Sequence, residues 1–129
     1  MASGLNFDVD SYLKGSPFQA RSVFRKGDIP LLDNPHRESR PDSGFVVLVS
    51  EEQGQGLSEQ VGPAMTFLVK HEKELDRLKL VGVDNMLLDF GVEVGNEIQH
   101  SDYLPPDLLV VMARFRMGLV VSTVRFPSG

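Results

Sequence analysis

Residues 86–94 carry the pattern that most constrains the fold. In this stretch, MLLDFGVEV, apolar residues at every second position alternate with a more polar set. A period of two places successive side chains on opposite faces of an extended strand. One face is apolar throughout, and the other holds Asp89, Gly91 and Glu93. The stretch therefore predicts a β-strand with one face against a core and the other toward solvent or a partner.

Strand and helix signals come before this strand. The run GFVVLVS (44–50) has apolar residues on both parities, which predicts a strand covered on both faces and makes it the expected central strand. Within 57–80, apolar residues recur at helical spacing. Pro63 lies early in that segment. It predicts either a kink or a helix that starts at this proline.

A second helix and a last strand follow. LPPDLLVVMARFRMG (104–118) has prolines suited to a first helical turn, and it ends on Gly118, where a left-handed cap residue belongs. Residues 119–125 predict a final strand. Strand, helix, strand, helix and strand make two consecutive crossovers, and right-handed crossovers put both helices on one face of a small sheet.

The first forty residues give weaker signals. Asp8 or Asp10 is suited to cap a short helical turn that Gly15 ends. Residues 20–25 predict a short strand at the edge of the sheet or antiparallel to a neighbour, and the proline-rich residues 27–42 predict an exposed, flexible connection. The predicted fold class is α/β (α+β), a two-layer sandwich with a mixed sheet of four or five strands and two main helices on one face.

Composition excludes several classes of protein. With 129 residues, 41% of them hydrophobic, the chain fits one compact domain over residues 1–129. It has no cysteine, which excludes disulfides, a zinc ribbon and a thiol nucleophile. No apolar run approaches the roughly 20 residues of a membrane span and no leader pattern opens the chain, which predicts a cytoplasmic protein that binds no membrane. Nucleic acid is a poor partner because a clustered basic face is absent, and no motif predicts a metal or another cofactor.

The net charge of −5 is unevenly spread, because residues 84–107 hold six acids and no Lys or Arg. This favours a basic protein partner, although a modest negative charge also serves solubility. Asp89 and Glu93 lie roughly 13 Å apart on one strand, farther than paired catalytic carboxylates. We therefore expect a non-catalytic protein-binding domain. A structural homodimer, paired through a sheet face or edge, is an alternative. The candidate partner-binding residues are Asp89, Glu93, Glu97 and Asp102.

A loop around His100 gives an enzymatic alternative. Glu97 and Asp102 flank this histidine, so His100 is a candidate general base in a small enzyme or ligand-binding domain. Arginines on a strand can bind a carboxylate or another anion, or they can keep an edge strand from pairing with another molecule. The one compact basic spot, and hence the candidate anion site, consists of Arg21, Arg25 and Lys26.

A series of short motifs resembles a family of small, uncharacterised bacterial proteins. The motifs are, in order, FDVDSYL, FRKGD, SGF, LDFGVE and LPPDLLVVMARFRMGLVVSTV, and the resemblance covers about residues 5–125. It implies the same fold, and the family has no activity that transfers to named residues. Small domains of this kind are sometimes found beside toxin systems as candidate immunity proteins, which implies an immunity-like role. The chain differs from the commoner pattern in lacking a clear opening strand before FDVD.

Overall fold

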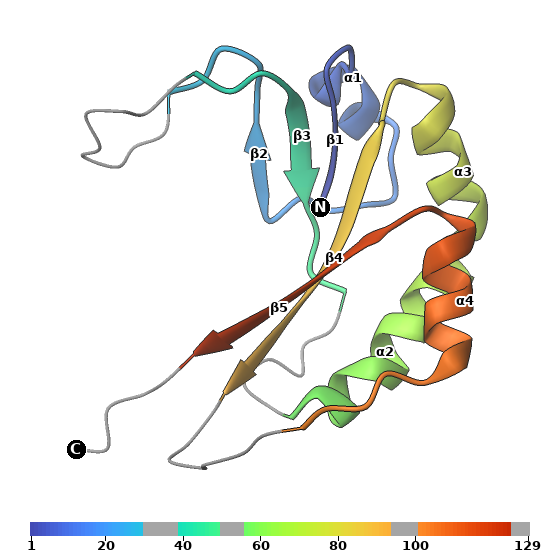
Figure 1. Ribbon diagram of the computed structural model, residues 1–129. Coiled ribbons are helices and arrows are strands. Elements are labelled where there is room, and N and C mark those ends of the chain that lie inside the picture. Colours follow the sequence, from blue (N-terminus) through green and yellow to red (C-terminus); the bar gives the residue numbers. More distant parts are fainter. Residues whose placement is uncertain (30–38, 50–55, 94–100, 125–129) are drawn as a thin grey trace. The chain divides into compact units, whose positions relative to one another are not determined.

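The strands of the chain form one open, mixed sheet in the order β2-β3-β1-β4-β5 (Figure 1). Together with four helices in the described part of the chain, this sheet confirms the predicted α+β sandwich. The computed structural model describes residues 1–29, 39–49, 56–93 and 101–124. In chain order the elements are β1 (Ala2–Gly4), α1 (Val9–Lys14), β2 (Ser22–Phe24), β3 (Ser43–Val46), α2 (Leu57–Lys70), α3 (Glu72–Leu80), β4 (Asn85–Glu93), α4 (Pro106–Arg114) and β5 (Gly118–Val124).

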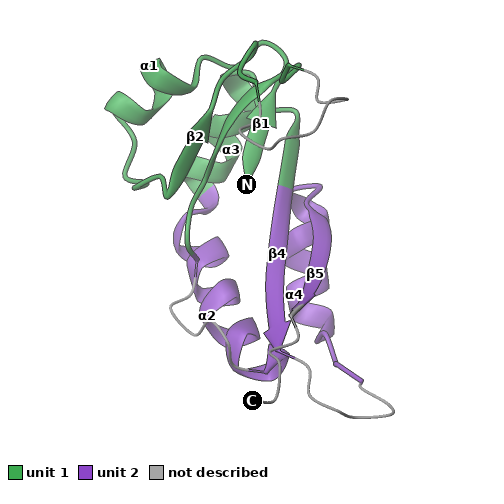
Figure 2. Cartoon of the chain, turned by 90° about the vertical axis from the view of Figure 1, so that its left-hand side faces the viewer, with its two compact units in different colours: residues 1–48, 73–86 green, residues 49–72, 87–129 purple. Residues whose placement is uncertain are grey.

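The chain divides into two compact units (Figure 2). Unit 1 consists of Met1–Leu48 and Lys73–Met86, and unit 2 consists of Val49–Glu72 and Leu87–Gly129. Strand β4 contributes to both, because its first two residues pair with β1 and the remaining seven pair with β5. The prediction of a single domain stays a prediction.

Strand β1 is the middle strand of the sheet and runs antiparallel to both β3 and β4. The expectation that 44–50 forms the central strand is therefore wrong. The chain also has an opening strand before FDVD, namely β1, which the sequence had not indicated. All three residues of β1, ASG, are small and buried. Gly44 of β3 lets this backbone approach closely, since a Cβ at Gly44 would collide with the carbonyl oxygen of Ala2 and the ring of Phe24.

Four aromatic rings form the centre of the unit 1 core. Phe45 of β3 stacks on Tyr12 of α1 with ring centroids 5.5 Å apart. The ring centroids of Phe7 and Phe18 lie 6.2 and 6.1 Å from the ring centroid of Phe45. All four side chains are buried, and each burial of this kind contributes roughly 1.5–3 kcal/mol. The motif residues FDVDSYL and SGF therefore meet in one core.

Two predictions for the N-terminal part are confirmed. Helix α1 begins after Asp8, whose carboxylate caps it, and ends at Gly15. Strand β2 pairs antiparallel with β3 and forms one edge of the sheet. Most of the predicted connection 27–42 lies outside the described residues, which omit 30–38.

The single helix predicted over 57–80 is two helices, α2 and α3, separated by His71. The apolar stripe continues through both, but Leu68 is buried in unit 2 and Leu75 in unit 1. The break at His71 thus lies next to the boundary between the two units, at Glu72 and Lys73.

Helix α2 begins at Leu57, so Pro63 lies inside it and the alternative start at that proline is wrong. The first turn is held by tertiary contacts. Leu57 is buried, and Gln60 Nε2 donates a hydrogen bond to the carbonyl oxygen of Gly91 in β4 (2.7 Å). These contacts offset the backbone hydrogen bond that a proline removes.

Helix α4 ends earlier than predicted. The left-handed residue is Arg116, with φ of 54°, and Gly118 is the first residue of β5. The amides of Arg116 and of the next residue donate to the carbonyls of Ala113 and Met112 at 3.0 and 2.9 Å, the paired bonds of a Schellman motif. Phe115 is buried at this point and stabilises the early end, so the prediction of Gly118 as the cap is wrong.

Both predicted crossovers connect parallel strands. β4 and β5 pair in parallel from Leu87 opposite Gly118 to Glu93 opposite Val124, with α4 between them in the chain. β3 and β4 are each antiparallel to β1 and hence parallel to one another. In unit 2, helices α2 and α4 pack together, and their buried residues join those of β4 in one core.

Candidate functional site

Strand β4 presents two carboxylates on one open face. Its side chains alternate between buried and exposed along the strand, so Phe90 belongs to the core while Asp89 and Glu93 face outward. Asp89 Oδ1 accepts a hydrogen bond from the hydroxyl of Ser122 on β5 (2.9 Å). Neither β4 nor β5 carries a Lys or Arg. The open face is thus acidic, and neither of the two strands that form it supplies a positive charge.

Strand β5 is the other edge of the sheet and lies alongside β4 (Figure 2). Leu119 and Val121 pair with Leu88 and Phe90 and therefore project to the same, core-facing side. Leu88 and Phe90 are 3% and 2% exposed, whereas Leu119 and Val121 are 38% and 42% exposed. The core of unit 2 thus covers β4 and leaves the next strand partly open. Val120, opposite Asp89 on the other face, is 37% exposed.

The loop before α4 contributes one described candidate. Asp102 is exposed there. His100 and Glu97, the proposed general base and its neighbour, lie outside the described residues. The enzymatic alternative at His100 stays a prediction.

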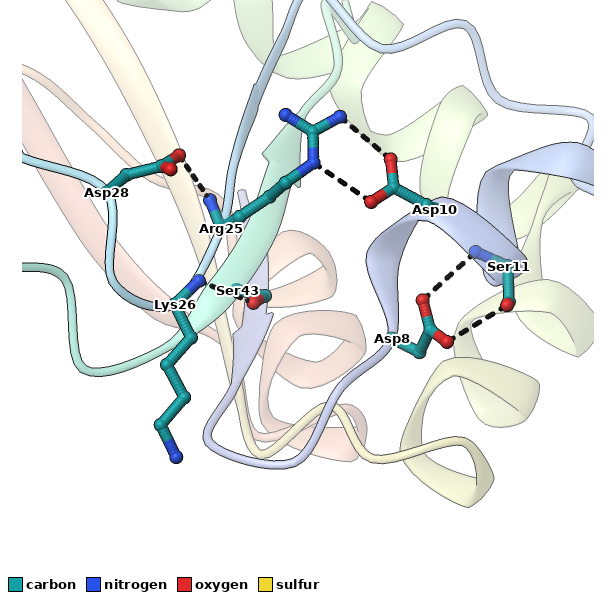
Figure 3. Close-up of polar contacts among 7 residues, drawn as sticks. All are labelled: Asp8, Asp10, Ser11, Arg25, Lys26, Asp28 and Ser43. Atoms are coloured by element: carbon teal, nitrogen blue, oxygen red, sulfur yellow. Dashed lines mark hydrogen bonds and ion pairs between the residues drawn. The ribbon is translucent and has the colours of Figure 1, made fainter.

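The basic spot at the start of the chain is engaged with an internal carboxylate (Figure 3). Arg25 Nε donates to Asp10 Oδ2 at 2.9 Å and Nη2 donates to Asp10 Oδ1 at 2.7 Å. The hydrogen bonds from this guanidinium lower the pKa of Asp10 below its ordinary value of 3.8. An arginine of the spot does clamp a carboxylate, and that carboxylate belongs to the FDVDSYL motif of the same chain.

The segment FRKGD forms a turn beside this ion pair (Figure 3). The amide of Asp28 donates to the carbonyl of Arg25, and its carboxylate accepts the amide of Arg25 at 2.8 Å. Gly27 has φ of 92°, which glycine adopts without strain. The amide of Lys26 donates to Ser43 Oγ on β3 at 2.8 Å, while the Lys26 side chain extends away from the group. Arg21 is exposed at the start of β2. The motif therefore joins the end of β2 to β3 and α1. Arg21, Arg25 and Lys26 are all exposed, and Arg25 is paired with Asp10.

A second polar group in unit 1 surrounds the buried Tyr12. Its hydroxyl donates to Glu74 Oε1 of α3 at 2.6 Å, and Arg77 Nη1 donates to the same oxygen at 2.9 Å. Burial first, and then the hydrogen bond to Glu74, raise the pKa of Tyr12 above its ordinary value of 10. A phenol that stays protonated fixes α1 to α3, which is a structural role.

Two features of the site were not predicted. Residues 119–125 carry strand signals, but these signals do not place the strand at an edge of the sheet. The absence of any charge from Gly118 to Val124 is the feature that distinguishes it from a protected edge. The pairing of Arg25 with Asp10 was also not foreseen, because the two residues belong to different elements.

Within the described ranges, no group of three or more His, Cys, Asp or Glu is arranged to hold a metal ion. No helix among these residues has the length and apolar character needed to cross a membrane. Comparison with protein-family models, curated proteins and solved structures gave no significant match.

Proposed function

We propose that this chain is a non-catalytic, cytoplasmic protein-binding domain that recognises a basic partner through the open face of β4. The observation that carries the proposal is the exposure of Asp89 and Glu93 on one face of a strand, beside a second strand without charge. Carboxylates without a cation on either strand attract a positively charged partner and raise its rate of association. Binding of this kind weakens as salt screens the charges.

An immunity-like role is the specific form of this function that the motif resemblance implies. The partner would then be a basic toxin, neutralised in the cytoplasm by occlusion of its surface. The arrangement of β4 suits occlusion better than chemistry, because Asp89 and Glu93 are four residues apart on a strand and so roughly 13 Å from one another. Paired catalytic carboxylates lie at about 5–9.5 Å.

The test is a pull-down from native cells with the wild-type chain and a charge-reversed variant, Asp89→Lys/Glu93→Lys. The partner should be basic, and the variant should capture at least about tenfold less of it, because like charges then face one another. Asp76→Lys/Glu59→Lys is the matched control, since it makes the same charge change at exposed helix positions. Equal capture by both variants, or an acidic partner, would refute the proposal.

A further inference from the structure

The two edges of the sheet differ in how well they are protected against pairing with another strand. β2 has three residues, with Arg21 before it and Arg25 and Lys26 after it. Short length and flanking cations are devices that keep edge strands from associating. β5 has seven residues, GLVVSTV, with no charge and no proline. Only β4 pairs with it within the described part of the chain, so one side of its backbone is open.

The side chains around β5 define what would fit there. On the core-facing side, the partly exposed Leu119 and Val121 require apolar side chains to cover them. On the open side lie Val120 and, one strand farther in, Asp89 and Glu93. A strand added to β5 would run about 10 Å from β4, two strand spacings away. Long Lys or Arg side chains on the added strand extend across Val120 and so bring their charges close to the two carboxylates of β4.

From this complementarity we infer that β5 accepts an extended strand of the partner, with apolar residues alternating with Lys or Arg, by strand addition. The inference rests on the proposed function and names how the basic partner is held. Backbone hydrogen bonds to β5 give the register, apolar side chains cover Leu119 and Val121, and basic side chains meet Asp89 and Glu93. A second copy of this chain fits less well, because its β5 brings no cation to these carboxylates.

The probe is a capped peptide of alternating valine and lysine, about as long as β5, titrated into the full-length chain and followed by amide NMR shifts and hydrogen exchange. Shifts should concentrate on residues 118–124, and the amides of this strand that point away from β4 should gain protection. A peptide with glutamate in place of lysine should bind at least about tenfold more weakly. Equal binding of the two peptides, or shifts centred elsewhere, would overturn the inference.

Backbone methylation of the same peptide separates strand addition from charge attraction. The valine amides point to one side of an extended peptide and the lysine amides to the other. Methylating one set should reduce binding at least about tenfold while methylating the other leaves it unchanged, because only one side faces β5. If both methylated peptides bind as the parent does, strand addition is wrong.

The outcomes also separate this inference from the proposed function. If Asp89→Asn/Glu93→Gln weakens binding of the lysine peptide while methylation has no effect, the acidic face binds and strand addition fails. If native-partner capture survives charge reversal, the proposed function itself fails. Sedimentation of the chain alone tests the second copy. A dimer that excludes the lysine peptide would assign β5 to self-association and overturn the inference.

Discussion

Arg25 and Asp10 form a bidentate ion pair that links the turn after β2 to helix α1. The pair joins two short motifs of the sequence, FDVDSYL and FRKGD. Together with the contacts of Tyr12 and Phe45, it shows that these motif residues build unit 1. The features that suit binding lie in unit 2, on β4 and β5.

The pair predicts a specific titration of Asp10. Its pKa is lowered in the folded chain by the hydrogen bonds from Arg25, so the contribution of the pair is present above pH 3.8 and is lost as the pH falls through the lowered pKa. In Arg25→Gln, the pKa of Asp10 should rise toward 3.8, as measured by carboxyl NMR. Lys26→Gln removes the same charge one residue away and should leave the pKa of Asp10 lowered. An unchanged pKa in Arg25→Gln would show that the pair is not formed in solution.

The hydroxyl of Tyr12 should contribute measurably to stability. Tyr12→Phe keeps the stacking on Phe45 but removes the hydrogen bond to Glu74, and should lower the free energy of unfolding by about 1 kcal/mol. Because folding raises this pKa, the contribution is full below pH 10 and declines as the pH rises above it. Tyr103→Phe, at an exposed position, is the control and should have no effect in the same urea titration. Equal stability of the two variants would contradict this account.

Close packing of β3 on β1 predicts that Gly44 tolerates no side chain. Gly44→Ala should lower the free energy of unfolding by about 1–3 kcal/mol, since the new methyl group meets the Ala2 backbone and the Phe24 ring. Gly91→Ala, on the open face of β4 with nothing within 4 Å of the added carbon, should be neutral or slightly stabilising. Urea denaturation of both variants tests this, and a tolerated Gly44→Ala would argue against the central position of β1.

The end of α4 predicts a stabilising substitution. Arg116 adopts a left-handed conformation that glycine reaches without strain, so Arg116→Gly should raise the free energy of unfolding by about 0.5–1 kcal/mol. Arg21→Gly is a control, because Arg21 is exposed and has a negative φ. It should not stabilise. Thermal unfolding of the two variants decides the matter, and a destabilised Arg116→Gly would mean that the arginine side chain is needed at this turn.

The sequence predicts an element where the residues of that element carry a local signal. Strand β4 is recognisable because buried side chains such as Phe90 alternate with exposed ones such as Asp89. Helix α1 is recognisable because Asp8 and Gly15 are typical residues at the two ends of a helix. Strand β1 was not, because ASG has no pattern and its position depends on pairing with β3 and β4.

The candidate site was only partly predictable for a related reason. The exposure of Asp89 and Glu93 follows from local alternation, whereas the open side of β5 depends on strand order. Local pattern likewise does not show where one unit ends and the other begins, and the break at His71, beside that boundary, was therefore missed.

The most direct test of the central claim is where the native partner touches the chain. A photo-crosslinking residue placed at Val120, on the open side of β5, should capture a basic partner in native cells. The same residue at Leu80, which is 86% exposed in unit 1, should not. Capture at Val120 alone, lost in Asp89→Lys/Glu93→Lys, is the result we predict. Capture at Leu80 and not at Val120 would contradict binding through β4 and β5.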